Sequence, residues 1–196
     1  MFFRREKSAI DYLIVGLGNP GAEYEKTRHN SGFSAVDYIS GRAGIEINKL
    51  KHSAKVGVGM IGDKKVMLMK PQTYMNRSGI AVSDAVRYYG IPVERVIVFS
   101  DDISLDVGRV RIRRSGSAGG QKGLASIIEC LSSDGFPRIK IGVGAKPNPE
   151  YDLADWVLSK FTSSEIERIS ARYESIYEAL CLIMDGKMED AMQKCN

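Results

Sequence analysis

The sequence predicts an α/β fold, in which a single domain holds a twisted mixed β-sheet flanked by helices. Short apolar runs rich in β-forming residues interleave with longer segments whose apolar residues recur at helical spacing. The chain has 196 residues, of which 43% are hydrophobic and 27% charged, which is enough to bury one sizeable core. No internal repeat interrupts this pattern. We therefore expect one domain over residues 12–196, preceded by an N-terminal extension of residues 1–11.

The first strand and the first helix are expected on either side of a glycine-rich loop. Residues 12–17 are an apolar run that ends at the dense turn signal of residues 18–21, which predicts a buried strand opening onto a loop. Apolar residues at helical spacing over residues 31–42 then predict a helix that ends near Gly41 or Gly44.

A hairpin is expected next. Residues 54–61 and 66–69 are β-forming runs that flank a polar turn at residues 62–65. Residues 70–76 are not expected to be regular throughout, because Pro71 cannot donate to a strand ladder.

The second half of the chain continues the alternation of helices and strands. Residues 78–89 predict a helix with Ser78 as its candidate N-cap. Basic and apolar side chains alternate over residues 109–113 and 138–144, which predicts two strands with one basic face each. The remaining predicted elements are a buried strand at residues 96–99, a helix over about residues 121–131 and mostly helical structure over residues 153–195.

The charge of the chain is unevenly distributed. Lys and Arg number 28 and Asp and Glu 24, which gives a net charge of +4. Residues 104–146 hold eight basic and three acidic residues, whereas residues 147–196 hold five basic and ten acidic ones. A basic middle beside an acidic end indicates a face suited to an anionic partner such as nucleic acid, although scatter over a solvated surface gives the same totals.

The cysteines and the N-terminal residues indicate in which cellular compartment the protein is expected. Cys130, Cys181 and Cys195 are far apart and odd in number, which is typical of thiols that pack in a reducing environment. The start lacks the apolar run of a secretory signal, and no stretch approaches the ~20 apolar residues of a membrane span. We expect a cytoplasmic monomer that makes no membrane contact.

A glycine motif follows the first predicted strand. Gly16, Gly18 and Gly21 have the spacing of a dinucleotide-binding fingerprint, but that fingerprint needs a helix that begins within the glycine run. Asn19 and Pro20 make a turn there instead, so we expect no nucleotide cofactor. The loop presents Asn19 at a strand end, either to grip an amide or carbonyl group or only to shape its own turn.

A candidate general base lies in a polar stretch before the first helix. Imidazole titrates near neutral pH, so His29 suits that role, and a capping or surface histidine is the alternative. A catalytic imidazole needs a carboxylate that holds its tautomer. Asp101 directly follows an apolar strand, and Asp102 competes for the same role. The other histidine, His52, lies in a lysine-rich region and is expected at the surface.

No nucleophile and no metal-binding set stand out. The sequence from Ser115 to Gly119 resembles an esterase elbow, but the first glycine of G-x-S-x-G is missing. Two histidines without H-E-x-x-H, together with unpaired cysteines, give no metal set. Attack by water that a histidine activates is the simplest hydrolytic scheme that remains.

Two predicted strands carry basic ladders. Arg109, Arg111 and Arg113 point one way from their strand, and Arg138 and Lys140 repeat the pattern. Such ladders neutralise a phosphate backbone well. Charge also protects an exposed edge strand against aggregation, and the sequence leaves both interpretations open.

Together these features resemble bacterial-type peptidyl-tRNA hydrolase over nearly the whole chain after residue 11. Four motifs of that family occur in order at the expected spacings. They are Gly16-Leu17-Gly18-Asn19-Pro20-Gly21 with Tyr24 and Thr27-Arg28-His29-Asn30-Ser31-Gly32; Lys70-Pro71-Gln72-Thr73-Tyr74-Met75-Asn76-Arg77-Ser78-Gly79; Ser100-Asp101-Asp102 with Leu105 and Gly108; and Gly116-Ser117-Ala118-Gly119-Gly120-Gln121-Lys122-Gly123-Leu124. The resemblance implies a phosphorylase/hydrolase-like fold and hydrolysis of the ester between an N-blocked aminoacyl group and the tRNA 3′ ribose.

The resemblance also implies roles for four central residues. His29 is the base that activates water, and Asp101 stabilises it in the basic form. Asn19 resembles the residue that distinguishes a blocked peptidyl amine from a free aminoacyl amine. Asn76 would help to hold substrate and water near the ester.

Further positions are implied to contact the tRNA. Tyr24 and Tyr74 match substrate-lining positions near the tRNA 3′ end. Phosphate contacts give affinity without reading sequence, which suits an enzyme that must accept every tRNA. The basic positions expected to make such contacts are Arg111, Arg113 and Arg138.

One motif departs from the family pattern. The fourth motif usually ends Gly-Gly-His-Asn-Gly, whereas this chain has Gln121 and Lys122 in place of His and Asn. Lys122 keeps donors, loses the acceptor and adds a charge, so it is expected to contact either the substrate end or a phosphate. The departure keeps open a competing class, a non-catalytic RNA-binding relative such as the plant organellar splicing factors that share this fold. A cofactor-binding module is the third class.

Overall fold

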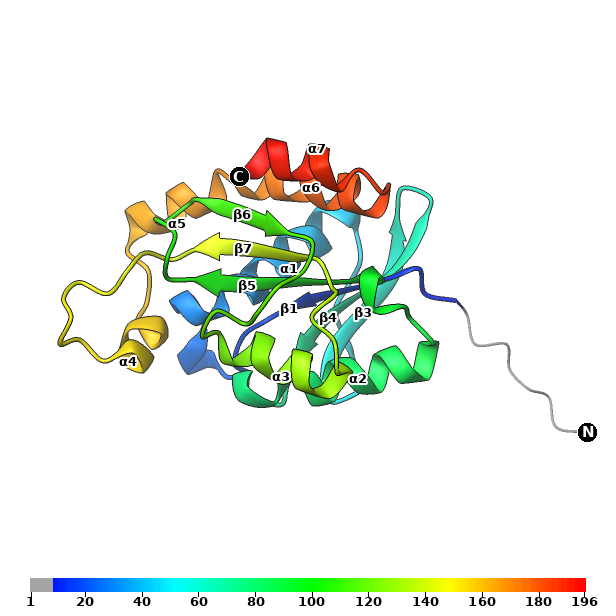
Figure 1. Cartoon of the computed structure of the whole chain (residues 1–196), viewed down its shortest axis with the longest axis horizontal. Helices are drawn as coiled ribbons and strands as arrows, with labels where there is room; N and C mark the ends of the chain where they lie inside the picture. Colours follow the sequence, from blue (N-terminus) through cyan, green and yellow to red (C-terminus); the bar gives the residue numbers. More distant parts are fainter. Residues whose placement is uncertain (1–8) are drawn as a thin grey trace, which may run out of the picture.

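The structure is a computed structural model that describes residues 9–196, so residues 1–8 of the expected N-terminal extension lie outside the described part. Residues just before the first strand pack against the domain. Ile10 is buried, and the carboxylate of Asp11 accepts a hydrogen bond from the backbone N–H of Lys65 at 2.7 Å. The chain forms a single domain with a seven-stranded mixed sheet between two layers of helices, which confirms the predicted fold class (Figure 1).

The sheet has the strand order β2-β3-β4-β1-β5-β7-β6. The strands β4, β1, β5 and β7 run parallel at its centre, and β2, β3 and β6 are antiparallel to their neighbours. The bounds are β1 (Tyr12–Gly16), β2 (Lys49–Lys51), β3 (Ala54–Ile61), β4 (Lys64–Pro71), β5 (Val96–Asp102), β6 (Val110–Arg113) and β7 (Arg138–Gly142).

The helices form two layers, with α1, α6 and α7 on one face of the sheet and α2 and α3 on the other (Figure 1). Their bounds are α1 (Ser31–Ala43), α2 (Ser78–Tyr89), α3 (Lys122–Leu131), α4 (Leu153–Leu158), α5 (Ser163–Ser170), α6 (Tyr173–Met184) and α7 (Met188–Cys195). Four short 3-10 helices are η1 (Ala22–Tyr24), η2 (Arg28–Asn30), η3 (Met75–Arg77) and η4 (Val93–Arg95).

The central strand β1 is buried on both faces. Ile14 packs into the core under α1, α6 and α7, whereas Leu13 and Val15 pack into the core under α2 and α3. This explains why the sequence of β1 is continuously apolar, because both sides of a central parallel strand are covered.

The winding of the chain brings several strand ends together. After β1 the chain reaches β4 on one side of β1 and then returns to β5 on the other side. The carboxyl ends of these three parallel strands therefore meet where the winding reverses. Open α/β sheets bind ligands at such a point.

Some of the predicted helix caps and turn positions are confirmed by the structure, and others are wrong. The left-handed C-cap of α1 is Gly44, one of the two predicted positions. The prediction of Ser78 as an N-cap is wrong: Ser78 is the first residue of α2, and its hydroxyl donates to the carbonyl of Met75 at 2.9 Å within the preceding turn. The hairpin strand β4 begins at Lys64, so the turn is shorter than predicted. Pro71 is the last residue of that strand, as its missing donor requires.

Candidate active site

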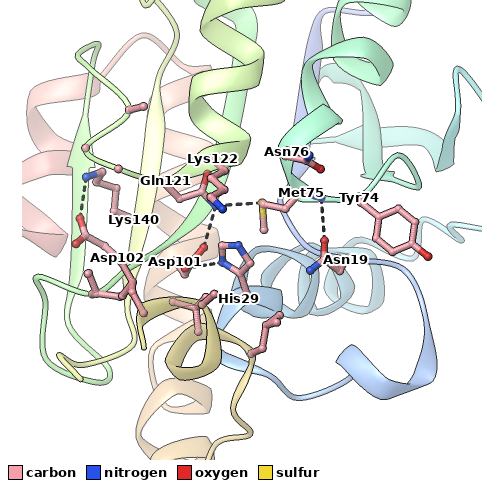
Figure 2. A pocket seen from close by; sticks show the side chains of 18 of the residues that line it. Asn19, His29, Tyr74, Met75, Asn76, Asp101, Asp102, Gln121, Lys122 and Lys140 are labelled. Atoms are coloured by element: carbon pink, nitrogen blue, oxygen red, sulfur yellow. Dashed lines mark hydrogen bonds and ion pairs between the residues drawn. The ribbon is translucent and has the colours of Figure 1, made fainter. Parts of the chain in front are cut away.

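A cavity of about 740 Å³ opens at the carboxyl ends of the central strands (Figure 2). One part of its wall is polar and comes from the loops after β1, β4 and β5, and an apolar part comes from α4. The lining residues are Asn19, His29, Tyr74, Met75, Asn76, Asp101, Asp102, Ile103, Ala118, Gly119, Gly120, Gln121, Lys122, Lys140, Asp152, Leu153, Ala154, Val157 and Leu158. None of these is a serine, threonine or cysteine, so none of them offers an aliphatic hydroxyl or a thiol as a nucleophile.

His29 and Asp101 form a buried pair in this cavity. His29 Nδ1 lies 2.8 Å from Asp101 Oδ2, and the two side chains are 11% and 3% exposed. A carboxylate on Nδ1 fixes the neutral ring with its proton on Nδ1 and leaves Nε2 as an acceptor. The contact decides between the two carboxylates that the sequence left open, because Asp101 and not Asp102 meets His29.

Glycines at the β1–α1 junction bring His29 to the strand ends. A Cβ atom on Gly16 would collide with the carbonyl of Gly32, and one on Gly18 would collide with the ring of Phe33. The absent side chains therefore let α1 pack directly on the loop after β1. The glycine run serves this close approach, and Figure 1 shows no helix that begins inside it, as the rejection of the dinucleotide fingerprint requires.

Asn19 is held by a reciprocal pair of hydrogen bonds with Asn30. The Asn19 backbone N–H donates to Asn30 Oδ1 at 2.8 Å, and Asn30 Nδ2 donates to the Asn19 carbonyl at 3.0 Å. Asn19 Oδ1 in turn accepts the Met75 backbone N–H at 2.8 Å. Because this backbone donor fixes the amide orientation, the Asn19 NH₂ group is on the side of the cavity that His29 lines (Figure 2).

Asn76 lies beside Met75 in η3, at the end of β4. Its side chain lines the cavity and has no partner among the residues drawn in Figure 2. Its donors and acceptor are therefore available to a molecule in the cavity.

Gln121 completes the support of the pair, and the sequence analysis noted it only as a departure from the family pattern. Its Nε2 donates to Asp101 Oδ1 at 3.0 Å and lies 3.1 Å from the sulfur of Met75. Its Oε1 accepts the backbone N–H of Leu124 at 2.7 Å, which makes Gln121 the N-cap of α3. The signal that could have identified it is its position directly before a helix, after a glycine-rich loop.

Asp102 and Lys140 form a second charged pair in the cavity. Lys140 Nζ lies 2.7 Å from Asp102 Oδ2, and the hydroxyl of Ser104 donates to Asp102 Oδ1 at 2.6 Å. Burial alone would raise the pKa of Asp102, but the hydrogen bonds from Lys140 and Ser104 outweigh it and hold that pKa below its usual range. The sequence analysis placed Lys140 on a basic strand face but did not expect it in the site.

Tyr74 and Tyr24 lie at different distances from the cavity. Tyr74 lines it and is 53% exposed. Tyr24 is not among the lining residues and instead meets Tyr74 edge to face, with 6.4 Å between the ring centroids. Tyr74 therefore lies in the wall of the cavity, whereas Tyr24 packs against Tyr74 outside it, and a substrate contact by Tyr24 stays a prediction.

The residues predicted to contact phosphate also differ in where the structure places them. Arg111 and Arg113 alternate along β6 with the buried Val110 and Ile112, and Arg111 pairs in register with Lys140 of β7. Lys122 is exposed and lines the cavity.

Arg138 does not fit the predicted role. It is 1% exposed, and its guanidinium donates to the carbonyls of Gly116, Ser117, Asp134 and Phe136. Burial lowers its pKa. The expectation that Arg138 contacts phosphate is therefore wrong, because its donors are used to hold the loop before α3.

His52 was expected at the surface, but its side chain is only 4% exposed. Its Nδ1 lies 2.7 Å from Asp84 Oδ2, and its ring packs against Tyr88 and Tyr89. The chain thus contains a second His–Asp pair, which lies outside the cavity.

Two further observations concern metal ligands and membrane spans in the described part of the chain. Among residues 9–196, no three His, Cys, Asp or Glu side chains converge where they could hold a metal ion. In the same residues, no helix has the length and apolar character needed to cross a bilayer.

Comparisons with known proteins show the family of this chain. The family model for peptidyl-tRNA hydrolase matches residues 13–196. The peptidyl-tRNA hydrolase of Caldanaerobacter subterraneus subsp. tengcongensis is 49% identical over 185 residues, which cover 94% of this chain and 99% of that protein. That of Lachnospira eligens is 47% identical over 186 residues and covers the two chains equally well, at 94% and 99%. The crystal structure of peptidyl-tRNA hydrolase from Acinetobacter baumannii matches with a TM-score of 0.89 at 34% identity and covers 95% of this chain and 94% of that one. The chain therefore belongs to the peptidyl-tRNA hydrolase family.

Proposed function

We propose that this protein hydrolyses the ester bond between the peptide and the 3′ ribose of peptidyl-tRNA, with His29 as the general base, and so returns tRNA to use. The observation that carries the proposal is the 2.8 Å contact between His29 Nδ1 and Asp101 in a cavity lined by Asn19 and Asn76. Family membership and fold support the reaction class.

In the proposed reaction, His29 Nε2 takes a proton from a water molecule as the water oxygen attacks the ester carbonyl carbon. Asp101 stabilises the imidazolium that forms. The tetrahedral intermediate then collapses, the bond to the 3′ oxygen of the ribose breaks, and the proton passes from His29 to that oxygen. General-base help of this kind is worth about 10²–10⁴-fold, which is adequate for an ester.

Asn19 provides a physical basis for choosing blocked substrates. Its Oδ1 is occupied by the Met75 N–H, so the cavity meets only the NH₂ donor. A peptidyl group presents a carbonyl oxygen that can accept from this donor. A free aminoacyl ammonium presents donors alone, so it would leave the Asn19 amide unpaired, and such mismatches discriminate strongly.

The remaining polar residues of the site receive roles from their positions. Asn76 can donate to the oxyanion or hold the attacking water, because its amide lines the cavity. Tyr74 offers a ring on which the terminal base can stack. Lys122, Arg111 and Arg113 supply positive charge on the side of α3 and β6, where tRNA phosphates would meet them.

The test compares N-acetylphenylalanyl-tRNA with unblocked phenylalanyl-tRNA. We expect cleavage of the first only, and we expect His29→Ala to lose most turnover while it still binds tRNA. His52→Ala is the matched control, since it removes the other Asp-bound histidine from outside the cavity and should leave turnover unchanged. Tight binding without cleavage of either substrate would favour the RNA-binding class, and retained turnover in His29→Ala would remove His29 as the base.

A further inference from the structure

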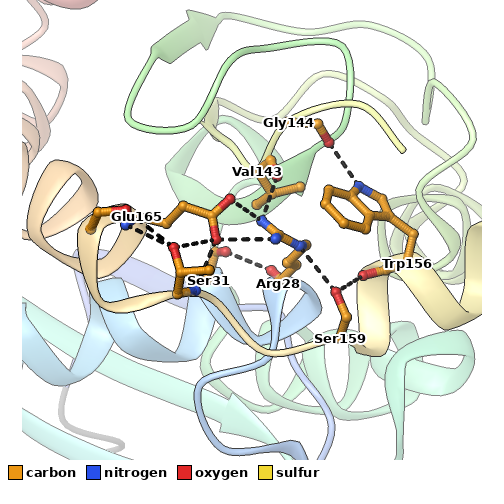
Figure 3. A network of polar contacts seen from close by, with 9 residues as sticks. Arg28, Ser31, Val143, Gly144, Trp156, Ser159 and Glu165 are labelled. Atoms are coloured by element: carbon orange, nitrogen blue, oxygen red, sulfur yellow. Dashed lines mark hydrogen bonds and ion pairs between the residues drawn. The ribbon is translucent and has the colours of Figure 1, made fainter. Parts of the chain in front are cut away.

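Arg28, the residue before the proposed base, faces away from the cavity into a buried cluster (Figure 3). Its side chain is 5% exposed, yet all three guanidinium nitrogens have partners. Nη1 and Nη2 grip the two carboxylate oxygens of Glu165 at 3.0 and 3.1 Å. Nε donates to Ser159 Oγ at 3.1 Å, and Nη1 also donates to the carbonyl of Val143 at 3.0 Å.

Two of the partners of Arg28, Val143 and Ser159, lie at the two ends of one segment, which we call the 144–159 segment. Val143 precedes it at the exit of β7, and Ser159 closes it after α4. The backbone N–H of Arg28 also donates to the carbonyl of Ser159 at 3.0 Å. The segment therefore leaves from Arg28 and returns to it.

Trp156 ties the middle of this segment to the same point. The guanidinium carbon of Arg28 lies 3.8 Å from the centroid of the Trp156 ring, and Trp156 Nε1 donates to the carbonyl of Gly144 at 2.9 Å. The hydroxyl of Ser159 donates to the carbonyl of Trp156 at 2.7 Å. A cation over a tryptophan face is the strongest arrangement of its kind.

Outside this cluster, the 144–159 segment is held at its start and just beyond its end. The Gly144 N–H donates to the Leu105 carbonyl at 2.9 Å, and the Phe161 N–H donates to the Lys26 carbonyl at 3.1 Å. Its helix α4 has six residues, none of which is buried, so neither length nor core packing fixes it. The other face of α4 lines the cavity through Leu153, Val157 and Leu158. Arg28 thus joins the apolar wall opposite the polar residues of the site to the turn that carries His29.

We propose that Arg28 is a positioning residue for the hydrolysis, which clamps the turn that carries His29 to the apolar α4 wall, so that base and wall keep a fixed spacing across the substrate. This rests on the proposed function of the cavity. A planar fork with five donors fits this junction, whereas a lysine ammonium can keep the charge but not the geometry. Burial would raise the pKa of Glu165, but the hydrogen bonds from Arg28 and Thr162 outweigh it and keep that pKa low, so the pair is ionic at neutral pH.

Arg28→Lys is the first test, with Arg42→Lys as the matched control. Arg42 also binds a glutamate, Glu174, and lies over a ring, Tyr177, but it is exposed on α1. Trp156 is the only tryptophan of the chain, so its fluorescence reports on the clamp directly. We expect Arg28→Lys to increase acrylamide quenching of Trp156 and to lower the single-turnover rate of N-acetylphenylalanyl-tRNA cleavage about ten- to hundredfold, since small misplacements near a reacting group cost that much.

Single-turnover rates at saturating enzyme separate positioning from simple loss of stability. A purely structural role would reduce the folded fraction but leave the rate constant of the folded molecules unchanged, and that outcome would overturn the proposal. Unchanged quenching in Arg28→Lys would overturn it too. If Arg28→Lys does not fold, Ser159→Ala removes the acceptor of Arg28 Nε together with the hydroxyl donor to the Trp156 carbonyl, and we expect it to shift both readouts in the same direction by a smaller factor.

The proposal and the function on which it rests fail in different ways. Cleavage by the wild type and its loss in His29→Ala test the function without any variant of Arg28. The quenching of Trp156 tests the clamp without any substrate. Wild-type cleavage together with unaltered rates in a loosened Arg28→Lys variant would leave the function standing and refute the clamp.

Discussion

Replacing Gln121 with glutamate separates two interactions that this side chain makes at once. Its Oε1 caps α3 by accepting the Leu124 N–H at 2.7 Å, and its Nε2 donates to Asp101 Oδ1 at 3.0 Å. In Gln121→Glu a carboxylate oxygen can still cap the helix, and its charge favours the helix N-terminus. At the helix cap alone this change adds between zero and about 1 kcal/mol of stability, which the repulsion from Asp101 opposes. The donor to Asp101 is lost.

The cost at the active site follows from the short distance to Asp101. Two carboxylates would lie close together, and two like charges 4 Å apart repel by about 4 kcal/mol at an effective dielectric constant of 20. That equals about 3 pKa units, so at neutral pH the pair either retains a proton or separates. Both outcomes weaken the 2.8 Å contact of Asp101 with His29. We expect kcat to fall about ten- to hundredfold, which is a part of the about 10²–10⁴-fold that general-base catalysis typically contributes.

The assay is cleavage of N-acetylphenylalanyl-tRNA at pH 7, with thermal unfolding measured on the same samples. Gln193→Glu makes the same charge change at an exposed position of α7 and should leave kcat unchanged. Gln121→Ala loses both interactions, so it should lose activity and also about 1 kcal/mol of stability through the missing cap. Wild-type kcat in Gln121→Glu would refute the reasoning that Gln121 holds Asp101.

Three further predictions concern other parts of the chain. Asn19→Asp keeps the acceptor for the Met75 N–H but removes the donor toward the cavity. Cleavage of N-acetylphenylalanyl-tRNA should therefore fall about a hundredfold, and the preference for it over phenylalanyl-tRNA should shrink. A retained preference would contradict the role of the Asn19 donor. Arg138→Met should lower the free energy of unfolding by about 2–3 kcal/mol in urea titrations, because several carbonyls lose their donor. It should leave the salt dependence of tRNA affinity unchanged. If the slope of log affinity against log salt concentration falls by about 0.9, Arg138 contacts a phosphate after all. Burial raises the pKa of Tyr173 to about 12, above the unfolded value of about 10. The stabilising contribution of the buried phenol is therefore complete below pH 10 and is lost as the pH rises through 12. An absorbance titration should show a phenol that ionises late and that Tyr173→Phe removes, and the absence of a late phenol in the wild type would disprove the raised pKa.

The helices and strands of this fold were predictable where burial leaves a recognisable pattern of apolar residues in the sequence. Strand β1 is apolar throughout because helices cover both its faces, and α1 ends at a glycine in the left-handed region. The sequence could not order the strands, because a crossover leaves no local signal. For the same reason it could not show that the ends of β1, β4 and β5 meet at one cavity.

Side-chain direction marks the limit of sequence reasoning at the site. Asp101 and Asp102 are consecutive, and although the family resemblance implied Asp101, the local pattern of residues does not tell them apart as the partner of His29. Only their surroundings do: Asp101 meets His29, and Asp102 meets Lys140. For Arg138, the alternation of basic and apolar residues correctly placed the side chain on the basic face of its strand. The same pattern could not reveal that the loop before α3 folds over this side chain.

The site is linked internally by bonds that need no substrate. Met75 joins two of its walls, because its N–H binds Asn19 and its sulfur lies against Gln121, which in turn holds Asp101. Asn19, Met75 and Gln121 do not titrate, so they can keep Asp101 and the Asn19 donor in place while His29 gains and loses a proton. Such an arrangement suits general-base catalysis, in which a charge develops on the ring and surrounding dipoles must already point correctly. Position 121 requires one N–H donor toward Asp101 and one acceptor for the N-terminus of α3, and a glutamine amide supplies both, as a neutral imidazole also could.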